Sequence, residues 1–279
     1  ALAAPLWRVG GMTGLGRDPS LLRPPGALDE DRFLARCIRC GQCMRVCPSN
    51  IIQPAVTSAG IAGLWTPTLN YRLGRAGCQP NCIACGQVCP TAAIRPVSLD
   101  EKLGTGPFAE AGPIRLGTAF VDRTRCLPWA MGRPCIVCQE VCPVSPKAIF
   151  VREVFEPLRG GRLPVATVQG AVLQLAVPAP VRGNLGTGDY FVRPAATPEA
   201  SPVRIVSLAG TGLTLQHPLP DAAAGREVEL LVRLQQPNVD PLRCIGCGMC
   251  EHECPVSGLR AIRVTSENES RSGPGRMLA

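Results

Sequence analysis

Sixteen cysteines, gathered in four clusters that each end in Cys-Pro, constrain this 279-residue chain more than any other feature. We call the clusters runs I to IV in chain order. Runs I and IV share the spacing C-x2-C-x2-C-x3-C-P, whereas runs II and III have one more distant cysteine before C-x2-C-x3-C-P. Run I contains Cys37, Cys40, Cys43 and Cys47; run II contains Cys78, Cys82, Cys85 and Cys89; run III contains Cys126, Cys135, Cys138 and Cys142; and run IV contains Cys244, Cys247, Cys250 and Cys254.

These spacings indicate iron–sulfur clusters. Runs I and IV match the run of bacterial [4Fe-4S] ferredoxins, in which a tight loop supplies three thiolates and the fourth cysteine ligates the other cluster of a pair. Glycines at Gly41, Gly86, Gly246 and Gly248 would allow the backbone to approach a cluster, or would simply form turns. Structural zinc prefers two separated C-x2-C knuckles per ion, and cysteines in one tight loop rarely pair as disulfides. We therefore predict that all sixteen cysteines ligate four [4Fe-4S] clusters.

The composition also favours a fold built around cofactors. Hydrophobic residues make up 46% of the chain, but aromatic residues only 4%, and there are 30 glycines and 29 prolines. A chain with so few large side chains and so many turn formers is expected to fold around something other than a broad apolar core. Four clusters would supply that interior.

The net charge of +8 does not indicate a nucleic-acid partner. No basic block is interleaved with aromatic residues for base stacking. Four oxidised clusters with their thiolates would contribute roughly −8, so the loaded protein would be nearly neutral. We interpret the arginines in or beside the runs as counter-charges for clusters, with ordinary surface charge as the alternative: Arg36, Arg39, Arg45, Arg123, Arg125 and Arg243.

The similarity between runs predicts how the clusters are paired. Run I resembles run IV and run II resembles run III, which favours one ferredoxin-like module nested inside another. A sequential scheme, which pairs run I with II and run III with IV, remains the alternative. The nested scheme predicts one outer set of Cys37, Cys40, Cys43 and Cys254, a second outer set of Cys244, Cys247, Cys250 and Cys47, and inner sets of Cys78, Cys82, Cys85 with Cys142 and Cys126, Cys135, Cys138 with Cys89.

The fold class that we predict is α+β, with two nested bacterial 2[4Fe-4S] ferredoxin-like modules and a small antiparallel β-domain inserted before run IV. Asp29 is a plausible N-cap of a short helix that would bring Phe33 and Leu34 against the first cluster. A turn of helix and then a strand are expected after each Cys-Pro. Strands of a barrel or sandwich are expected at 165–177, 189–193, 203–208, 212–216 and 226–234.

The expected domains are an N-terminal extension (1–28), runs I to III (29–150), the inserted β-domain (151–240), run IV (241–265) and a flexible tail (266–279). The insert is expected to serve structure or docking rather than catalysis. His252 could shift a nearby potential, although an exposed loop position is the plainer interpretation, and His217 is expected in a turn. Trp65 and Trp129 would shield clusters from water or simply pack.

Two segments carry a resemblance to a known family. The segments RPPGALDEDRFLARCIRCGQCMRVCP and AFVDRTRCLPWAMGRPCIVCQEVCP resemble the ferredoxin-type proteins of periplasmic nitrate reductase and methylamine dehydrogenase systems, the MauM/NapG type. The resemblance covers runs I, III and IV. It is weaker at run II, where the family more often has C-x2-C-x4-C-x3-C-P, and it does not extend to the insert. It implies an exported or membrane-associated four-cluster electron carrier.

The sequence therefore predicts an electron-transfer protein and not an enzyme. It would link a membrane quinol or cytochrome system to a partner redox enzyme, at the periplasmic face of the membrane, with a cytoplasmic location as the alternative. No stretch approaches eighteen apolar residues, so membrane contact would come through partners or through an anchor or signal missing before the apolar start Ala1–Leu6. The alternatives are a structural docking subunit of a large complex and a maturation factor for a partner metalloenzyme.

Overall fold

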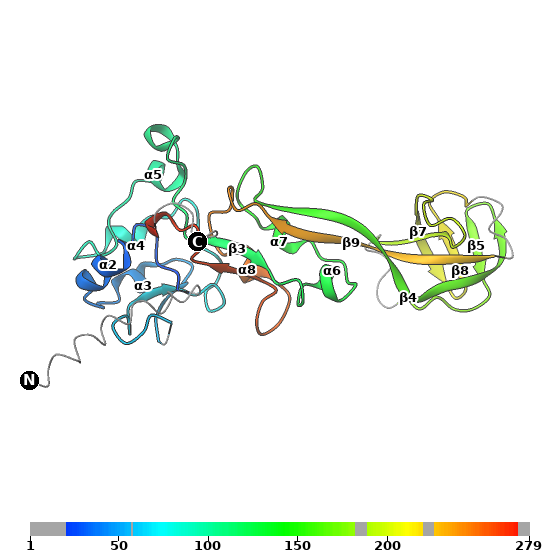
Figure 1. Cartoon of the computed structure of the whole chain (residues 1–279), viewed down its shortest axis with the longest axis horizontal. Coiled ribbons are helices and arrows are strands. Elements are labelled where there is room, and N and C mark those ends of the chain that lie inside the picture. The colour runs from blue at the N-terminus through cyan, green and yellow to red at the C-terminus, as the bar shows by residue number, and fades with distance from the viewer. Residues whose placement is uncertain (1–20, 57, 182–188, 220–225, 273–279) are drawn as a thin grey trace, which may run out of the picture. The chain divides into compact units, whose positions relative to one another are not determined.

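The computed structural model describes residues 21–56, 58–181, 189–219 and 226–272 (Figure 1). The chain forms two compact units. Unit 1 comprises the chain up to Asp122, Val137–Phe150 and the chain from Asn238 onward, and unit 2 comprises Arg123–Ile136 and Val151–Pro237. Helices and sheets both occur, as the α+β prediction requires. The apolar start Ala1–Leu6, before which we expected a missing anchor or signal, lies outside the described residues.

Unit 1 is built from short elements around the cysteine runs. Its two sheets have two antiparallel strands each, one pairing β1 with β2 and the other β10 with β3. Helix α3 packs near α4, and α7 packs near α8. In chain order the elements are α2 (Glu30–Arg36), α3 (Gln42–Val46), β1 (Ile52–Pro54), β2 (Pro67–Leu69), α4 (Ala84–Gln87), α5 (Leu99–Leu103), η2 (Gly106–Phe108), β3 (Thr118–Val121), α7 (Val137–Glu140), α8 (Met249–Glu253), β10 (Ile262–Thr265) and η5 (Ser270–Ser272).

The helical turns lie inside the cysteine runs and not after them, which corrects one expectation. Helices α3, α4, α7 and α8 each end before the last cysteine of their run, and turns or bends follow the Cys-Pro pairs. The strands expected afterwards do form as β1, β4 and β10. After run II, only an isolated bridge between Ile94 and Ala27 takes the place of a strand.

Helix α2 begins where the sequence predicts. The carboxylate of Asp29 accepts a hydrogen bond from the backbone N–H of Arg32 at 3.2 Å, which satisfies one of the free donors at the helix start. Phe33 is completely buried on the inner face of this helix. The N-cap and the apolar face together fix how the chain enters run I.

The described parts of the expected extension and tail, residues 21–28 and 266–272, pack within unit 1, and the rest of both segments lies outside the described residues. At the N-terminal side, the buried Arg23 donates hydrogen bonds to Glu30, to the hydroxyl of Thr66 and to the carbonyl of Pro67. At the C-terminal side, Arg271 forms ion pairs with Glu30 at 2.8 Å and with Glu269 at 2.7 Å. Glu30, in helix α2, therefore binds both the segment that contains Arg23 and the segment that contains Arg271.

Unit 2 contains α6 (Leu127–Ala130) and most of a closed six-stranded barrel (Figure 1). The predicted strand at 165–177 is a hairpin instead, because Gly170, with φ of +58°, forms a tight turn inside it. Gly210 forms the equivalent turn between β7 and β8 with φ of +61°. The barrel closes in the order β4-β5-β8-β7-β6-β9, with bounds β4 (Ile149–Gln169), β5 (Val172–Leu175), β6 (Tyr190–Pro194), β7 (Val203–Ala209), β8 (Gly212–Leu215) and β9 (Glu227–Val239).

The barrel has an aliphatic core of its own. Alternating residues of its strands point inward, and Leu173, Val192, Leu213, Val228 and Leu230 are fully buried there. Burial of each such side chain stabilises a fold by roughly 1.5–3 kcal/mol. Unit 2 can therefore be stabilised by apolar packing, as the Val- and Leu-rich composition of the insert indicates.

Candidate iron–sulfur sites

Run I closes around a hollow that also receives the last cysteine of run II. Cys37, Cys40, Cys43 and Cys89 line this hollow, together with the ring of Phe33 from α2. Burial raises the pKa of Cys43 to about 12, and the other three thiols of the hollow add to the rise. Four thiolates in so poorly solvated a space need a cationic partner, which the irons of a cluster would provide.

Backbone donors reach the sulfur of Cys89. The N–H of Ile94 lies 3.4 Å from this sulfur, and the hydroxyl of Thr91 lies 3.8 Å from it. Burial alone would raise the pKa of Cys89, but these hydrogen bonds lower it overall. Hydrogen bonds to ligand sulfurs are one of the factors that set the potential of a cluster.

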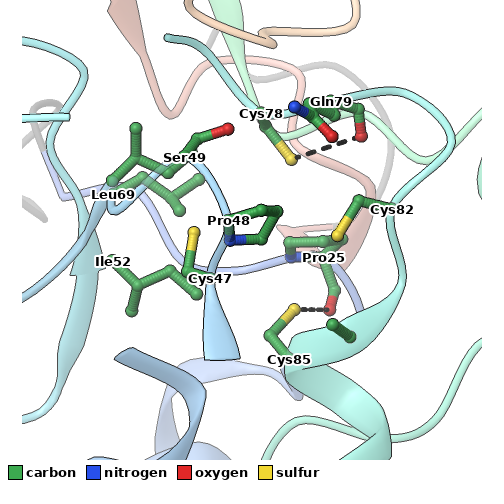
Figure 2. A pocket seen from close by; sticks show the side chains of 12 residues that line it. Pro25, Cys47, Pro48, Ser49, Ile52, Leu69, Cys78, Gln79, Cys82 and Cys85 are labelled. Atoms are coloured by element: carbon green, nitrogen blue, oxygen red, sulfur yellow. Dashed lines mark hydrogen bonds between the residues drawn. The ribbon is translucent and has the colours of Figure 1, made fainter. Parts of the chain in front are cut away.

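The second set of thiols mirrors the first, because run II receives the last cysteine of run I. The sulfurs of Cys47, Cys78, Cys82 and Cys85 face one hollow between these two runs (Figure 2). Burial raises the pKa of Cys85 to about 12. Apolar side chains from β1 and β2 form the opposite wall, including Ile52 and Leu69.

The third set combines run IV with the last cysteine of run III. Burial raises the pKa of Cys250 well above its usual range, and the charges of Cys247 and Cys244 add to the rise. The charge of Cys142 raises the pKa of the first three run IV thiols, Cys244, Cys247 and Cys250, which indicates that Cys142 is one of their neighbours. The backbone N–H of Ala119 in β3 donates to the sulfur of Cys244 at 3.3 Å.

The nested pairing that we predicted is therefore wrong, because run I exchanges its last cysteine with run II. Cys89 and not Cys254 lines the hollow of run I, and Cys47 lies with run II and not with run IV. The hollow of run II is lined by Cys47 and not by Cys142, whose charge instead raises the pKa of run IV thiols. The physical reason is that α3 packs near α4 and α7 near α8, which carries each final cysteine to the neighbouring run. Similar spacing in runs I and IV reflects a shared loop geometry, not a shared module.

Runs I and IV do follow the same backbone path. Arg39 and Gly246 occupy the same position in their runs and have φ of 57° and 67°, and Gly41 and Gly248, two residues later, have φ of 74° and 76°. Left-handed residues within a turn direct successive N–H groups to one side, and such concavities bind anions. The loop can therefore direct N–H groups at an anionic cluster with its thiolates.

Three of the four glycines that we singled out approach protein rather than open space. A Cβ at Gly248 would lie 2.2 Å from the ring of Tyr71, and one at Gly246 would lie 2.5 Å from the backbone of Gly117. A Cβ at Gly86 would lie 2.5 Å from the carbonyl of Arg95. These glycines therefore allow segments of the chain to pack against the runs.

Three of the arginines expected as counter-charges interact with other groups. Arg39 donates to the carbonyls of Leu64 and Ala62, both at 2.8 Å. Arg123 lies over the ring of Trp129, and Arg243 pairs with Asp240 at 3.3 Å. Lys102, which is not among the arginines named above, does reach a cysteine sulfur, that of Cys78. A signal for it existed, since the chain contains only two lysines.

The tryptophans and histidines differ in part from their expected roles. Trp65 is 58% exposed, and Trp129 donates its indole N–H to the carbonyl of Pro237 at 3.1 Å, so both are placed by contacts other than a thiol hollow. His217 lies in a bend, as expected. His252 is not in an exposed loop: it lies in α8, half-buried, with Nδ1 2.9 Å from the carbonyl of Tyr71.

Tyr71 joins the segment before run II to run IV. Its hydroxyl donates to the carbonyl of Gly246 at 2.6 Å, and its ring is almost completely buried. A few residues later, the N–H of Cys78 donates to the carbonyl of Cys247 at 2.7 Å. The second and third thiol sets are thus joined directly through the backbone of two ligand residues.

All sixteen cysteines are free thiols in this structure. Among the residues that the structure describes, no three His, Cys, Asp or Glu side chains converge on a point suitable for a single metal ion. A cubane differs from a single ion because its four thiolates bind four separate irons and so stand farther apart. Within the described ranges, every helix is too short or too polar to cross a bilayer.

Comparison with known proteins supports the same chemistry. The 4Fe-4S binding domain family matches residues 33–53 and 237–260, which contain runs I and IV. The methylamine utilization ferredoxin-type protein MauM of Methylophilus methylotrophus is 38% identical over 50% of this chain and 56% of its own length. The ferredoxin-type protein NapG of Escherichia coli K12 is 36% identical over 46% of this chain and 50% of its own length.

The chain therefore contains two segments that match the 4Fe-4S binding domain family, and it is similar to ferredoxin-type proteins. It spans about half the length of these curated relatives, whose names describe ferredoxin-type proteins and not enzymes. The MauM protein of Paracoccus denitrificans is 26% identical over 94% of this chain and 79% of its own length. Because this match covers nearly the whole chain, it includes the insert. The resemblance therefore extends farther than we predicted. No solved structure matches this chain.

Proposed function

We propose that this protein carries electrons, one at a time, through four [4Fe-4S] clusters. The observation that carries the proposal is the exchange of final cysteines between runs I and II, because the two clusters of a bacterial ferredoxin are ligated in this way. The proposed sets are Cys37, Cys40, Cys43 and Cys89 (set 1); Cys47, Cys78, Cys82 and Cys85 (set 2); Cys142, Cys244, Cys247 and Cys250 (set 3); and Cys126, Cys135, Cys138 and Cys254 (set 4).

Set 4 follows from reciprocity. Run III gives its last cysteine, Cys142, to set 3, and the ferredoxin rule then assigns the last cysteine of run IV, Cys254, to run III. Set 4 also takes the remaining cysteines of the chain, so that every thiol has one role.

Electrostatic effects between thiols and one backbone hydrogen bond support a linear order of the four sets. Cys43 of set 1 raises the pKa of Cys85 in set 2, and Cys138 of set 4 raises the pKa of Cys250 in set 3. Between the middle sets, Cys78 donates its N–H to the carbonyl of Cys247. Electrons would therefore enter or leave at sets 1 and 4 and cross between the two ferredoxin-like modules at sets 2 and 3.

The protein's own part in this transfer is to fix spacing and to tune potentials. Bound clusters would take up and release single electrons by tunnelling, without making or breaking bonds in the protein. Two features would tune the reduction potentials of the clusters. One is the N–H groups at the sulfurs of Cys89 and Cys244, and the other is the burial of the thiols. As partners we propose a membrane quinol or cytochrome system and a redox enzyme, at the periplasmic face of the membrane.

Iron content tests both the clusters and their pairing. Anaerobically purified protein should be brown and contain about sixteen irons. Cys37→Ser and Cys89→Ser should each lose one cluster, about four irons, and the double variant should lose no more, because both residues belong to set 1. Cys37→Ser combined with Cys254→Ser should instead lose about eight irons, because these residues belong to different sets.

The nested scheme would be restored if Cys37→Ser with Cys254→Ser lost only about four irons and Cys37→Ser with Cys89→Ser lost about eight. Colourless protein without iron would end the proposal as a whole. A protein with clusters that cannot be reduced and reoxidised would favour the structural docking role, and a partner that stays inactive with artificial donors in a deletion strain would favour a maturation role.

A further inference from the structure

Lys102 is a buried lysine whose ammonium group is directed at run II. It is 6% exposed, and its Nζ lies 3.5 Å from the sulfur of Cys78. Nζ also donates to the carbonyl of Gln79 at 2.8 Å and to the carbonyl of Cys82. An ammonium group has three donors, and lysine is rarely buried without partners. All three bonds therefore hold this cation at one thiol set.

Short-range contacts fix helix α5, which carries Lys102. The hydroxyl of Ser98 caps the helix by accepting from the N–H of Glu101 at 3.0 Å. Gly104 ends it with φ of +65°, and a Cβ there would overlap the backbone of Gly112 at 2.2 Å. The N–H of Ile114 donates to the carbonyl of Lys102 itself at 3.1 Å. The fold therefore fixes the helix that carries Lys102, and with it the position of the ammonium group.

The only other lysine provides an internal comparison. Lys147 donates to the carbonyls of Gln139 and Glu140 in run III, at 2.6 and 2.9 Å, and it is exposed. Both of these hydrogen bonds go to backbone oxygens. Lys147 is therefore an exposed cation on backbone oxygens, whereas the buried Lys102 also lies at a sulfur.

We propose that Lys102 raises the reduction potential of the cluster bound by Cys47, Cys78, Cys82 and Cys85. The inference rests on the proposed function. One electron from an external reductant makes that cluster more negative by one unit, while the ammonium group keeps its protons and its charge. A fixed cation at a ligand sulfur stabilises the reduced form more than the oxidised form, and more strongly in a buried site than in water.

The test is an anaerobic titration of the iron-loaded protein with dithionite, monitored by electron paramagnetic resonance. Lys102→Gln and Lys102→Met remove the charge, and one of the observed potentials should become more negative by about 59 mV, which is a tenfold change for a one-electron couple. Lys102→Arg keeps the charge and should restore most of the shift. Lys147→Gln, the matched control, should leave all potentials in place.

Two outcomes of the titration would overturn the proposal. One is an equal response, or no response, in the Lys102 and Lys147 variants. The other is loss of a single cluster in both Lys102→Gln and Lys102→Met with full iron in Lys102→Arg, which would assign Lys102 to cluster binding instead. A failure of the proposed function would be distinct, since the wild-type protein would then contain no iron and give no signal to titrate.

Amine acylation of the wild-type protein provides a second measurement without a variant. With iron bound, a reagent should modify Lys147 and leave Lys102 unmodified, as mass spectrometry of the peptides would show. After chelation of the iron in denaturant, both lysines should react. Equal rates for the two lysines in the loaded protein would contradict the buried position on which the proposal depends.

Discussion

Single residues hold unit 1 together around a buried charge cluster. Arg23 is 1% exposed and forms an ion pair with Glu30, which also receives Arg271 from the C-terminal side. Burial raises the pKa of Glu30, but the hydrogen bonds and charges of the two arginines outweigh it, so the pKa is lowered overall. This carboxylate contributes stability when it is ionised.

Glu30→Gln should destabilise the fold by about 3–5 kcal/mol, because it leaves buried arginines without their partner. A lowered pKa in the folded state means that the contribution is complete above the unfolded value of about 4.5 and is lost as the pH falls through the folded value. Anaerobic denaturant unfolding should therefore show the difference between wild type and variant shrinking below pH 4.5. In the control Glu153→Gln, which loses an exposed ion pair, the change should stay below about 1 kcal/mol.

At the scale of elements, each unit depends on a different kind of interior. The barrel strands enclose an aliphatic core with Leu173 and Leu230 at its centre. The short helices and strands of unit 1 surround thiol hollows, whose walls also contain apolar side chains such as Phe33, Ile52 and Leu69. The stability of the barrel should therefore be independent of iron, whereas that of unit 1 should require it.

Leu173→Ala should destabilise the barrel by about 2–5 kcal/mol, the usual cost of a cavity in a packed core. Circular dichroism during unfolding would measure this loss. The cluster absorbance and the iron content of the folded variant should equal those of wild type. A variant that loses iron in proportion to its stability would contradict the independence of the two interiors.

At the scale of the whole molecule, the junction between the middle thiol sets would decide whether the four proposed clusters form one relay. Tyr71 and the backbone bond from Cys78 to Cys247 make this junction. It joins residues far apart in sequence, and it places the ligand loops of two modules in contact. In the proposed relay, the distance over which an electron tunnels between sets 2 and 3 would depend on these few contacts.

Tyr71→Phe should cost about 1–3 kcal/mol, because the buried carbonyl of Gly246 loses its donor. The magnetic interaction between reduced clusters of the two modules should also weaken, which paramagnetic resonance of the fully reduced protein would detect. The chain's other tyrosine gives the control: Tyr190→Phe in β6 should leave that interaction as in wild type. An unchanged spectrum in Tyr71→Phe would remove this residue from the junction.

Much of the local structure could be predicted from the sequence, because it depends on neighbours along the chain. The Asp29 cap, the approach of Phe33 to run I and the barrel strands all follow from short patterns. Turns at glycines were harder to predict from the sequence. Gly170, for example, divides a segment that we predicted as one strand. A single Gly in a strand pattern fits a bulge as well as a turn, so pattern alone could not decide.

The sequence by itself determined the chemistry: sixteen cysteines in four spaced runs specify the kind of cofactor, since cluster ligation needs three thiolates in one tight loop. Only the tertiary structure decided which run receives each fourth cysteine, and it assigned Cys89 to run I against the predicted nesting. It also brought Lys102 and Tyr71 to the thiol sets. The physical reason is that the geometry of a ligand loop depends on neighbours along the chain, whereas the pairing of runs depends on how α3 packs with α4 and α7 with α8. The entropic cost of closing a loop changes too little with loop length to choose between the pairing schemes.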